Sequence, residues 1–269
     1  MMDEMIHVEV NGKNLEVRRG TRLLDACTAA GIFIPTLCYH PALPGFAGCR
    51  LCLVEQLRDG WSKLVAACEY PLRRNGERFS TDSEKVWRSR MKSAELLLAR
   101  APQAAEALQE VLGRAVTPRF TQLEVDNKKC ILCGLCYRLC HAQGTAAIHT
   151  SGRGANKIVS TPFHEASDAC IGCGSCAAIC PTGAITMREP EGKRALWRQL
   201  FPLERCPICG TPHITGRMID YMLEHTELSE DVIRMCPSCR LRYLSSRMTV
   251  GISGSLHAAA AGTDKGAHP

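Results

Sequence analysis

The chain carries two near-copies of one cysteine pattern, Cys130-Ile131-Leu132-Cys133-Gly134-Leu135-Cys136-Tyr137-Arg138-Leu139-Cys140 and Cys170-Ile171-Gly172-Cys173-Gly174-Ser175-Cys176-Ala177-Ala178-Ile179-Cys180. Both copies have the spacing C-x2-C-x2-C-x3-C. Three thiolates with two residues between each pair can wrap a loop around a four-iron cube, whereas the fourth follows on a helical turn and reaches the neighbouring cluster. The repeat therefore predicts a bacterial-type domain with two 4Fe–4S clusters.

This pattern also predicts which cysteines share a cluster. The first cluster takes Cys130, Cys133, Cys136 and Cys180, and the second takes Cys140, Cys170, Cys173 and Cys176. Gly134, Gly172 and Gly174 let the backbone approach inorganic sulfur. His141 stands where the second copy has Pro181, and we expect it to face solvent rather than to tune a cluster. Eight structural thiols or zinc sites fit this repeated spacing poorly.

An earlier set of four cysteines precedes the repeat. Cys38 is followed by the pair Cys49 and Cys52, and Cys68 lies further on. A 2Fe–2S cluster needs thiolates on a tightly wrapped loop and one from a distant strand end, and this set supplies both. The gap between the first two cysteines is longer than the plant-type spacing. Cys27 remains alone among the seventeen cysteines, and we expect it to be an apolar core residue of a helix.

The last set consists of two C-x2-C pairs, Cys206 with Cys209 and Cys236 with Cys239. Two such pairs typify a zinc ribbon, in which four sulfurs close a structural site. A rubredoxin-like single iron uses the same sulfurs, and a further cluster is an alternative, but zinc is the favoured interpretation. His213 lies near the first pair and is expected outside the metal shell because four cysteines already complete it.

Composition limits the partners and the compartment. The formal charge of +6 becomes roughly −2 once four thiolate sites are loaded, so the dispersed Lys and Arg residues compensate buried clusters rather than bind nucleic acid. Neither a secretory signal nor a membrane span is expected. Dense cysteines in such a chain indicate metal rather than disulfides, and we expect a cytoplasmic protein.

The predicted fold class is α+β. Alternating residues around the turn Asn11-Gly12 predict a hairpin, and a helix and further strands follow in a small mixed sheet. Pro102 is expected to separate two linker helices, and residues 146–163 to form an inserted hairpin. The predicted segments are a 2Fe–2S domain (1–82), a helical linker (83–120), a double 4Fe–4S domain (121–190), a four-cysteine zinc-ribbon-like module (191–245) and a disordered tail (246–269).

Two stretches around the first cysteines carry a family resemblance. Ile34-Pro35-Thr36-Leu37-Cys38-Tyr39-His40-Pro41 and Gly48-Cys49-Arg50-Leu51-Cys52-Leu53-Val54-Glu55 resemble the start of the large iron–sulfur subunit of respiratory complex I. They are also similar to the diaphorase iron–sulfur subunit of bidirectional NAD-linked hydrogenases, and to the front of iron-only hydrogenases and formate dehydrogenases. The resemblance covers roughly residues 5–190. It implies a β-grasp ferredoxin fold, the twelve iron–sulfur cysteines named above, and a flavoprotein partner that handles NAD(P)H.

One feature of those relatives is missing from this sequence. They usually carry a cluster held by one His and three Cys between the two modules. The corresponding stretch here is Ala101-Pro102-Gln103-Ala104-Ala105-Glu106, with neither residue type. We therefore expect that cluster to be absent and the electron path to differ from that of complex I.

These features favour an electron-transfer subunit of an oxidoreductase complex. It would relay single electrons between a flavin-bearing NAD(P)H module and a catalytic partner such as a hydrogenase or formate dehydrogenase. No nucleotide-binding glycine motif or nucleophile pattern is present, so the chain should have no substrate site of its own. The alternatives are a redox sensor that uses the C-terminal ribbon to contact a partner or DNA, and a free-standing NAD(P)H-dependent reductase, which would need nucleotide and flavin sites.

Overall fold

The computed structural model describes residues 4–247 and divides into two compact units. Of the described residues, the first unit comprises 4–170 and 174–186, and the second comprises 171–173 and 187–247. In the first unit lie β1 (Met5–Val10), β2 (Lys13–Arg18), α1 (Leu23–Ala29), β3 (Leu53–Arg58), β4 (Trp61–Ala66), β5 (Glu77–Ser80), α2 (Glu84–Arg100), α3 (Ala105–Leu112), α4 (Leu135–Ala142), β6 (His149–Ser151), β7 (Ile158–Ser160) and α5 (Ser175–Ala178). In the second lie β8 (Lys193–Leu196), β9 (Gln199–Arg205), β10 (Pro212–Thr215), α6 (Gly216–His225) and α7 (Glu230–Arg234).

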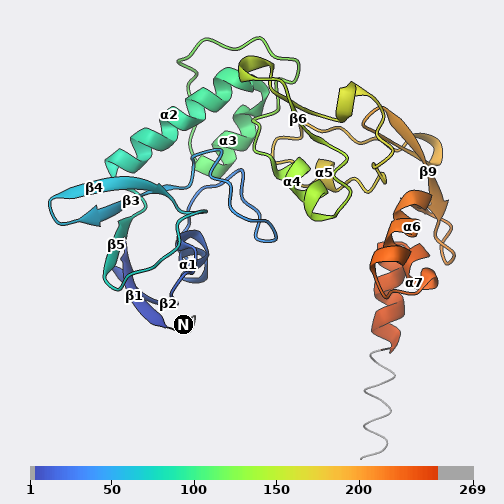
Figure 1. Ribbon diagram of the computed structural model, residues 1–269, viewed down its shortest axis with the longest axis horizontal. Helices are drawn as coiled ribbons and strands as arrows, with labels where there is room; N and C mark the ends of the chain where they lie inside the picture. Colours follow the sequence, from blue (N-terminus) through green and yellow to red (C-terminus); the bar gives the residue numbers. More distant parts are fainter. Residues whose placement is uncertain (1–3, 248–269) are drawn as a thin grey trace, which may run out of the picture. The chain divides into compact units, whose positions relative to one another are not determined.

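The first part of the chain folds as a five-stranded mixed sheet with α1 packed against it (Figure 1). The strand order is β2-β1-β5-β3-β4, with β1 and β5 parallel. The predicted hairpin turns at Asn11-Gly12, where both residues have positive φ as a tight two-residue turn requires. Cys27 is fully buried on α1, so the prediction that it is a core residue is confirmed.

A second core forms where α2 and α3 meet the loops that carry cysteines. Pro102 begins a short 3-10 turn between these helices, as predicted. The core combines residues from the first cysteine loop, both helices and the second cysteine loop: Leu37, Cys38, Leu43, Cys49, Leu51, Ala94, Leu98, Ala101, Ala104, Leu108, Leu112, Ile131, Cys133 and Leu135. The linker helices therefore pack against both cysteine-bearing regions within this unit.

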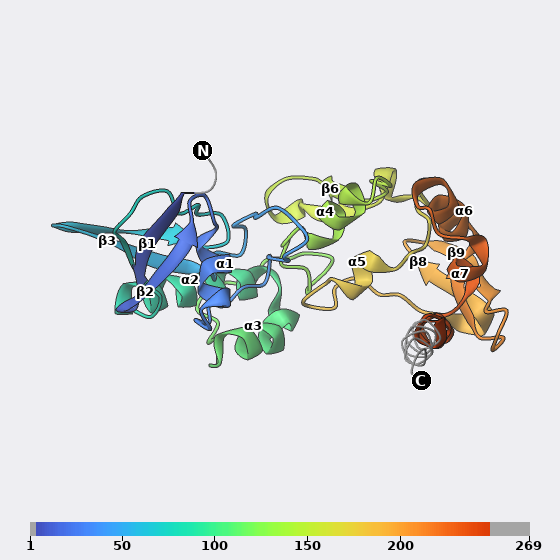
Figure 2. The same ribbon diagram turned by 90° about the horizontal axis from the view of Figure 1, so that it is seen from below.

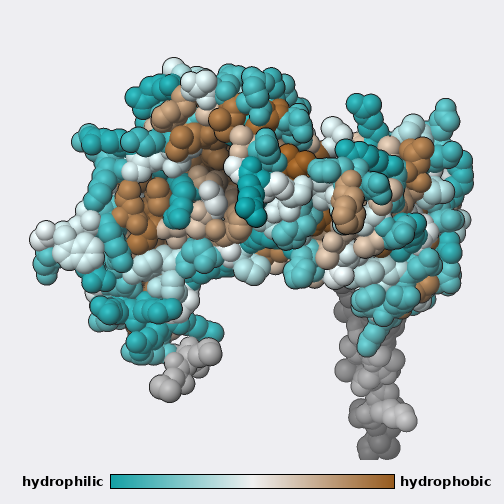
Figure 3. Space-filling view, turned by 45° about the horizontal axis from the view of Figure 1, so that its top comes forward, coloured by the Kyte–Doolittle hydropathy of each residue, from teal (hydrophilic) through white to brown (hydrophobic). Residues whose placement is uncertain are grey.

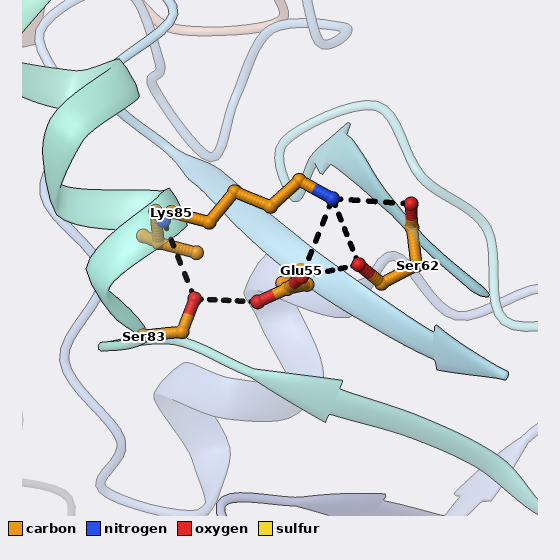
Figure 4. Close-up of polar contacts among 5 residues, drawn as sticks. Glu55, Ser62, Ser83 and Lys85 are labelled. Carbon is orange, nitrogen blue, oxygen red and sulfur yellow. Dashed lines mark hydrogen bonds and ion pairs between the residues drawn. The ribbon is translucent and has the colours of Figure 1, made fainter. Parts of the chain in front are cut away.

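Glu55 on β3 anchors the start of α2 (Figure 4). Its carboxylate accepts hydrogen bonds from the hydroxyls of Ser62 and of Ser83, the latter at 2.6 Å, and lies 3.4 Å from Lys85 Nζ. Ser83 also caps α2 by accepting from Val86 N–H. The hydrogen bond from Ser62, followed by that from Ser83, lowers the pKa of Glu55. One buried carboxylate thus joins β3, β4 and the N-terminus of α2.

The repeat region is built from α4, α5 and the predicted inserted hairpin, which is β6 paired antiparallel with β7 (Figure 2). Gly134 and Gly174 precede α4 and α5 in the left-handed conformation, with φ of 75° and 78°. Gln143 Nε2 donates to Ser175 Oγ at 3.2 Å and joins the end of α4 to the start of α5.

The second unit has a three-stranded sheet in the order β10-β9-β8, followed by α6 and α7. Helix α6 of this unit is amphipathic and buries Ile219 against Ile214 and Ile233. Residues 237–247 are helical, so this helix includes the first two residues of the predicted disordered tail. The rest of that predicted tail lies outside the described residues.

No helix within residues 4–247 is long and apolar enough to cross a membrane. On the face drawn in Figure 3, hydrophilic residues cover most of the surface and apolar residues lie in separate patches.

Candidate metal centres

The first cysteine set closes into one buried cluster of thiols, Cys38, Cys49, Cys52 and Cys68, each at most 3% exposed. Cys52 Sγ lies 3.4 Å from Cys68 Sγ, and Cys38 forms side-chain hydrogen bonds with both Cys49 and Cys68. The hydrogen bond with Cys68, followed by burial, raises the pKa of Cys52. A metal cation would replace the shared protons, because metal binding requires the thiolate form. The donor set fits a 2Fe–2S cluster.

The loop of the first set depends on a close backbone approach and on an arginine from α4. A Cβ on Gly45 would lie 2.2 Å from the carbonyl oxygen of Cys68, so only glycine fits there. Arg138 donates through Nη1 to the carbonyl oxygen of Cys38 at 3.4 Å and through Nη2 to that of Pro44. The sequence did not single out Arg138, because one arginine on a helix carries no motif.

The second set brings a distant cysteine to a local trio. Ile179, the residue before Cys180, packs against the second core, which contains Ile131 and Cys133. Asn127 Nδ2 also donates to the carbonyl oxygen of Ala184 at 2.9 Å, which joins the segment after α5 to the segment before Cys130. Burial, with smaller contributions from Cys180 and Cys130, raises the pKa of Cys133 to about 12. Four sulfurs from two chain segments fit the crossed ligand arrangement of a two-cluster domain.

The fourth cysteine of each repeat has the same local contacts. Ala147 N–H donates to Cys140 Sγ at 3.3 Å, and Ala184 N–H donates to Cys180 Sγ at 3.2 Å. Main-chain amides aimed at a ligand sulfur stabilise its negative charge and tune the potential of a bound cluster. His141, next to Cys140, is exposed as expected.

The second repeat contributes to both units. Cys170 and Cys176 are buried in the first unit, whereas Ile171–Cys173 belong to the second. Within the second unit, buried Arg194 donates to the carbonyl oxygen of Gly172 at 2.8 Å, and Thr215 Oγ1 donates to that of Ile171 at 2.5 Å. These bonds fix the short cysteine loop on the β-sheet of the second unit.

The last set is the most compact. The sulfurs of Cys206, Cys209, Cys236 and Cys239 all lie within 4.8 Å of one another, and only Cys209 is exposed. Cys236 N–H donates to Cys206 Sγ at 3.4 Å and lowers the pKa of that thiol. Thiolates around one zinc ion lie about 3.8 Å apart, close to the 3.7 Å between the sulfurs of Cys209 and Cys236. This group could therefore hold a single metal ion.

The fold around this group differs from the predicted ribbon. The first pair lies in the turn between β9 and β10, as a ribbon requires, but the second pair lies at the start of helix 237–247. Proline is well suited to the first turn of a helix, and Pro237 occupies that position. His213 Nε2 is hydrogen-bonded to the carbonyl oxygen of Arg234 at 2.9 Å and is not part of the four-cysteine group.

The stretch that lacks the His-and-Cys motif is closely packed. Ala101 and Ala104 are at most 1% exposed and contribute to the second core beside Leu108. Two buried alanines thus fill the core side of this stretch.

Two family matches cover the first three cysteine sets. Residues 3–83 match a family described as "2Fe-2S iron-sulfur cluster binding domain", and residues 123–187 match a "4Fe-4S dicluster domain". The chain is an iron–sulfur protein. Its first domain is a 2Fe–2S ferredoxin domain and its second a 4Fe–4S ferredoxin domain within a mixed α and β fold.

Similar proteins are subunits of pyridine-nucleotide-linked redox enzymes. The NADPH-Fe(3+) oxidoreductase subunit alpha of Geobacter sulfurreducens is 30% identical over 241 residues, which cover 81% of this chain and 28% of that protein. An NADH-quinone oxidoreductase subunit of Rhizobium meliloti is 30% identical over 77% of this chain and 27% of its own length. The NADP-reducing hydrogenase subunit HndD of Solidesulfovibrio fructosivorans is 30% identical over 69% of this chain and 36% of its own length. The iron–sulfur protein thus spans about a third or less of these relatives.

A solved structure of a related redox enzyme also resembles this chain. A chain of an NAD+-reducing [NiFe]-hydrogenase in the H2-reduced state aligns with a TM-score of 0.56 and 26% identity. The alignment covers 66% of this iron–sulfur protein and 85% of that chain. The protein is therefore homologous to iron–sulfur subunits of NADH-quinone oxidoreductases and NAD-reducing hydrogenases.

Proposed function

We propose that this iron–sulfur protein relays single electrons between a flavoprotein that exchanges electrons with NAD(P)H and a catalytic redox subunit, such as a hydrogenase or a formate dehydrogenase. The observation that supports this function most directly is the packing of Ile179, next to Cys180, against the core that contains Cys133 of the first repeat. A crossed ligand set couples two clusters in one small domain, which suits electron transfer better than a single labile site. The high density of cysteine thiols favours a reducing compartment such as the cytoplasm.

The proposed ligands are sixteen cysteines in four sets: Cys38, Cys49, Cys52 and Cys68 for a 2Fe–2S cluster; Cys130, Cys133, Cys136 and Cys180 for one 4Fe–4S cluster; Cys140, Cys170, Cys173 and Cys176 for the other; and Cys206, Cys209, Cys236 and Cys239 for zinc. When bound, iron–sulfur clusters accept and release one electron at a time. The buried thiols would hold them away from water, and the amides of Ala147 and Ala184 would stabilise sulfur charge.

The compactness of the last set supports a single ion rather than a third four-iron cluster, because a cube keeps its thiolate ligands much farther apart. Zinc is the preferred ion, since four cysteine thiolates in a closed tetrahedron form a structural zinc site. This site would then stabilise the second unit and take no part in electron transfer.

Metal analysis and partner capture together test the proposal. Protein purified without oxygen should contain about ten iron atoms and one zinc per chain, and it should co-purify with a flavoprotein. A content of about eleven iron atoms and no zinc would show that the last cysteine set holds a single iron ion instead of zinc. Iron-loaded protein that retains specific DNA and no flavoprotein would contradict the relay and support a sensor.

A further inference from the structure

Helix α2 carries two buried arginines ten residues apart, Arg90 and Arg100, which are 2% and 9% exposed. Within residues 4–247, the hydrogen bonds that they donate all go to main-chain carbonyl oxygens. No carboxylate in this part of the chain comes within ion-pair distance of either guanidinium. Burying a cation without an opposite charge is costly, so these two positions call for an anion nearby.

Arg90 lies beside the first cysteine set. Its Nε and Nη2 donate to the carbonyl oxygen of Leu53, the residue after Cys52, at 3.1 and 2.7 Å. Its guanidinium also lies 5.3 Å from the centre of the Trp87 ring. Burial lowers the pKa of Arg90 to about 10, an effect that Cys52 and Asp82 partly oppose, so Arg90 remains a cation at neutral pH.

Arg100 lies beside the second cysteine set. Its Nη1 and Nη2 donate to the carbonyl oxygens of Ala155 and Lys157 at 3.1 and 2.5 Å. Its Nε is buried and has no hydrogen-bond partner in the described part of the chain. Ala101, the residue after Arg100, is fully buried in the second core with Ile131 and Cys133, so the end of α2 lies against the loop that carries the second cysteine set.

Other arginines of the chain show the usual arrangement. Arg88, two residues before Arg90, is exposed and pairs with Glu84 on the same helix. Arg194, which is buried in the second unit, pairs with Glu189 at 2.7 Å. Arg90 and Arg100 have no carboxylate partner among the described residues. In this they differ from Arg194, which is also buried, and from Arg88, which is on the same helix.

An oxidised cluster with four thiolates carries a net charge of about −2, and each electron it accepts adds one more negative charge. We propose that Arg90 and Arg100 are the buried counter-cations of the first and second cysteine sites, and that each raises the reduction potential of its own site. The inference rests on the proposed function, because it requires the two clusters to be bound. Both arginines donate to main-chain carbonyls rather than to a cysteine sulfur, so they act as positioning and electrostatic residues.

The test is a redox titration followed by electron paramagnetic resonance on whole, anaerobically purified protein. Arg90→Gln should lower the reduction equilibrium constant of the 2Fe–2S cluster at least tenfold, which equals 59 mV for one electron, and leave the cubane signals unchanged. Arg100→Gln should lower the reduction equilibrium constant of the 4Fe–4S cluster at the second cysteine set by the same factor and leave the 2Fe–2S signal unchanged. Arg90→Lys and Arg100→Lys keep the charge and should stay near wild type. Arg88→Gln, the same change on the exposed face of the helix, is the matched control.

A purely structural role predicts a different pattern. If both arginines only fasten loops through carbonyl groups, the Lys and Gln variants would lower the melting temperature alike and leave the potentials unchanged, and this proposal would be overturned. Arg90→Met and Arg100→Met provide a second neutral pair, with unbranched side chains, should a Gln variant fail to fold. Wild-type protein without iron would instead overturn the proposed function itself, so the two failures are distinguishable.

Discussion

The first and last cysteine sets use the same four thiols in opposite settings. The first set is wholly buried, and two of its members lie in a core shared with α2 and α3. The last set has one exposed cysteine, Cys209, and its own core contains only the other three cysteines, Met235 and the half-buried Tyr243 among the described residues. A protein core therefore supports the first site, whereas the last site has little core of its own. This contrast agrees with the proposed roles, a buried redox cluster at the first site and a metal that stabilises the fold at the last.

Breaking the last site should have the largest effect. Cys236→Ser should remove the zinc and unfold much of the segment from Met187 onward, because structural zinc contributes about 10 kcal/mol or more to the folding of such small modules. Metal analysis should show zinc lost and iron retained, and limited proteolysis should cut within that segment.

Ser238→Ala, between the same two cysteines, is the control and should keep both the zinc and the protease resistance. A Cys236→Ser protein that lacks zinc yet resists proteolysis as wild type does would show that the small core suffices.

Breaking the first site should remove a signal rather than a fold. Cys49→Ser should abolish the rhombic paramagnetic signal of the 2Fe–2S cluster and spare both cubane signals, because the shared core still holds the loop. Cys27→Ala removes an equally buried thiol that lies outside the four cysteine sets, and it should keep every signal. Loss of all signals in Cys49→Ser would show that the first cluster also maintains the second domain.

The shared core itself can be weakened. Leu108 on α3 is fully buried among residues from both cysteine loops, so Leu108→Ala should lower the free energy of unfolding by about 2–5 kcal/mol. Urea denaturation followed by circular dichroism measures this change. Leu96→Ala on the exposed face of α2 should cost far less, and equal costs would refute the assignment of a supporting core.

The 2Fe–2S and 4Fe–4S domains could be predicted from sequence because most of their cysteines lie close together along the chain and their spacing reflects local geometry. The second C-x2-C pair could not be placed, since the same pattern suits a strand turn at Cys206 and a helix start at Cys236. The sequence also did not single out Arg90 and Arg100 on α2, because arginines on a helix usually face solvent. One signal was available: Val86, Arg90, Ala94 and Leu98 recur every four residues, so Arg90 lies on the apolar face.

The smallest predicted effect concerns Glu55, which fixes the start of the helix that carries Arg90. Its pKa in the folded protein lies below the ordinary value of 4.5, so the unfolded chain binds the proton more readily. The stabilisation from the Glu55 carboxylate is therefore complete above pH 4.5 and is lost as the pH falls through the folded pKa.

Glu55→Gln should lower the free energy of unfolding by about 1–2 kcal/mol at pH 7. The urea midpoints of variant and wild type should stay equally separated from about pH 8 to 5 and converge below about pH 4.5, since comparison at each pH cancels any acid lability of the clusters that both proteins share. A separation that persists in acid would mean that the Glu55 carboxylate stabilises the start of α2 through packing rather than through its charge.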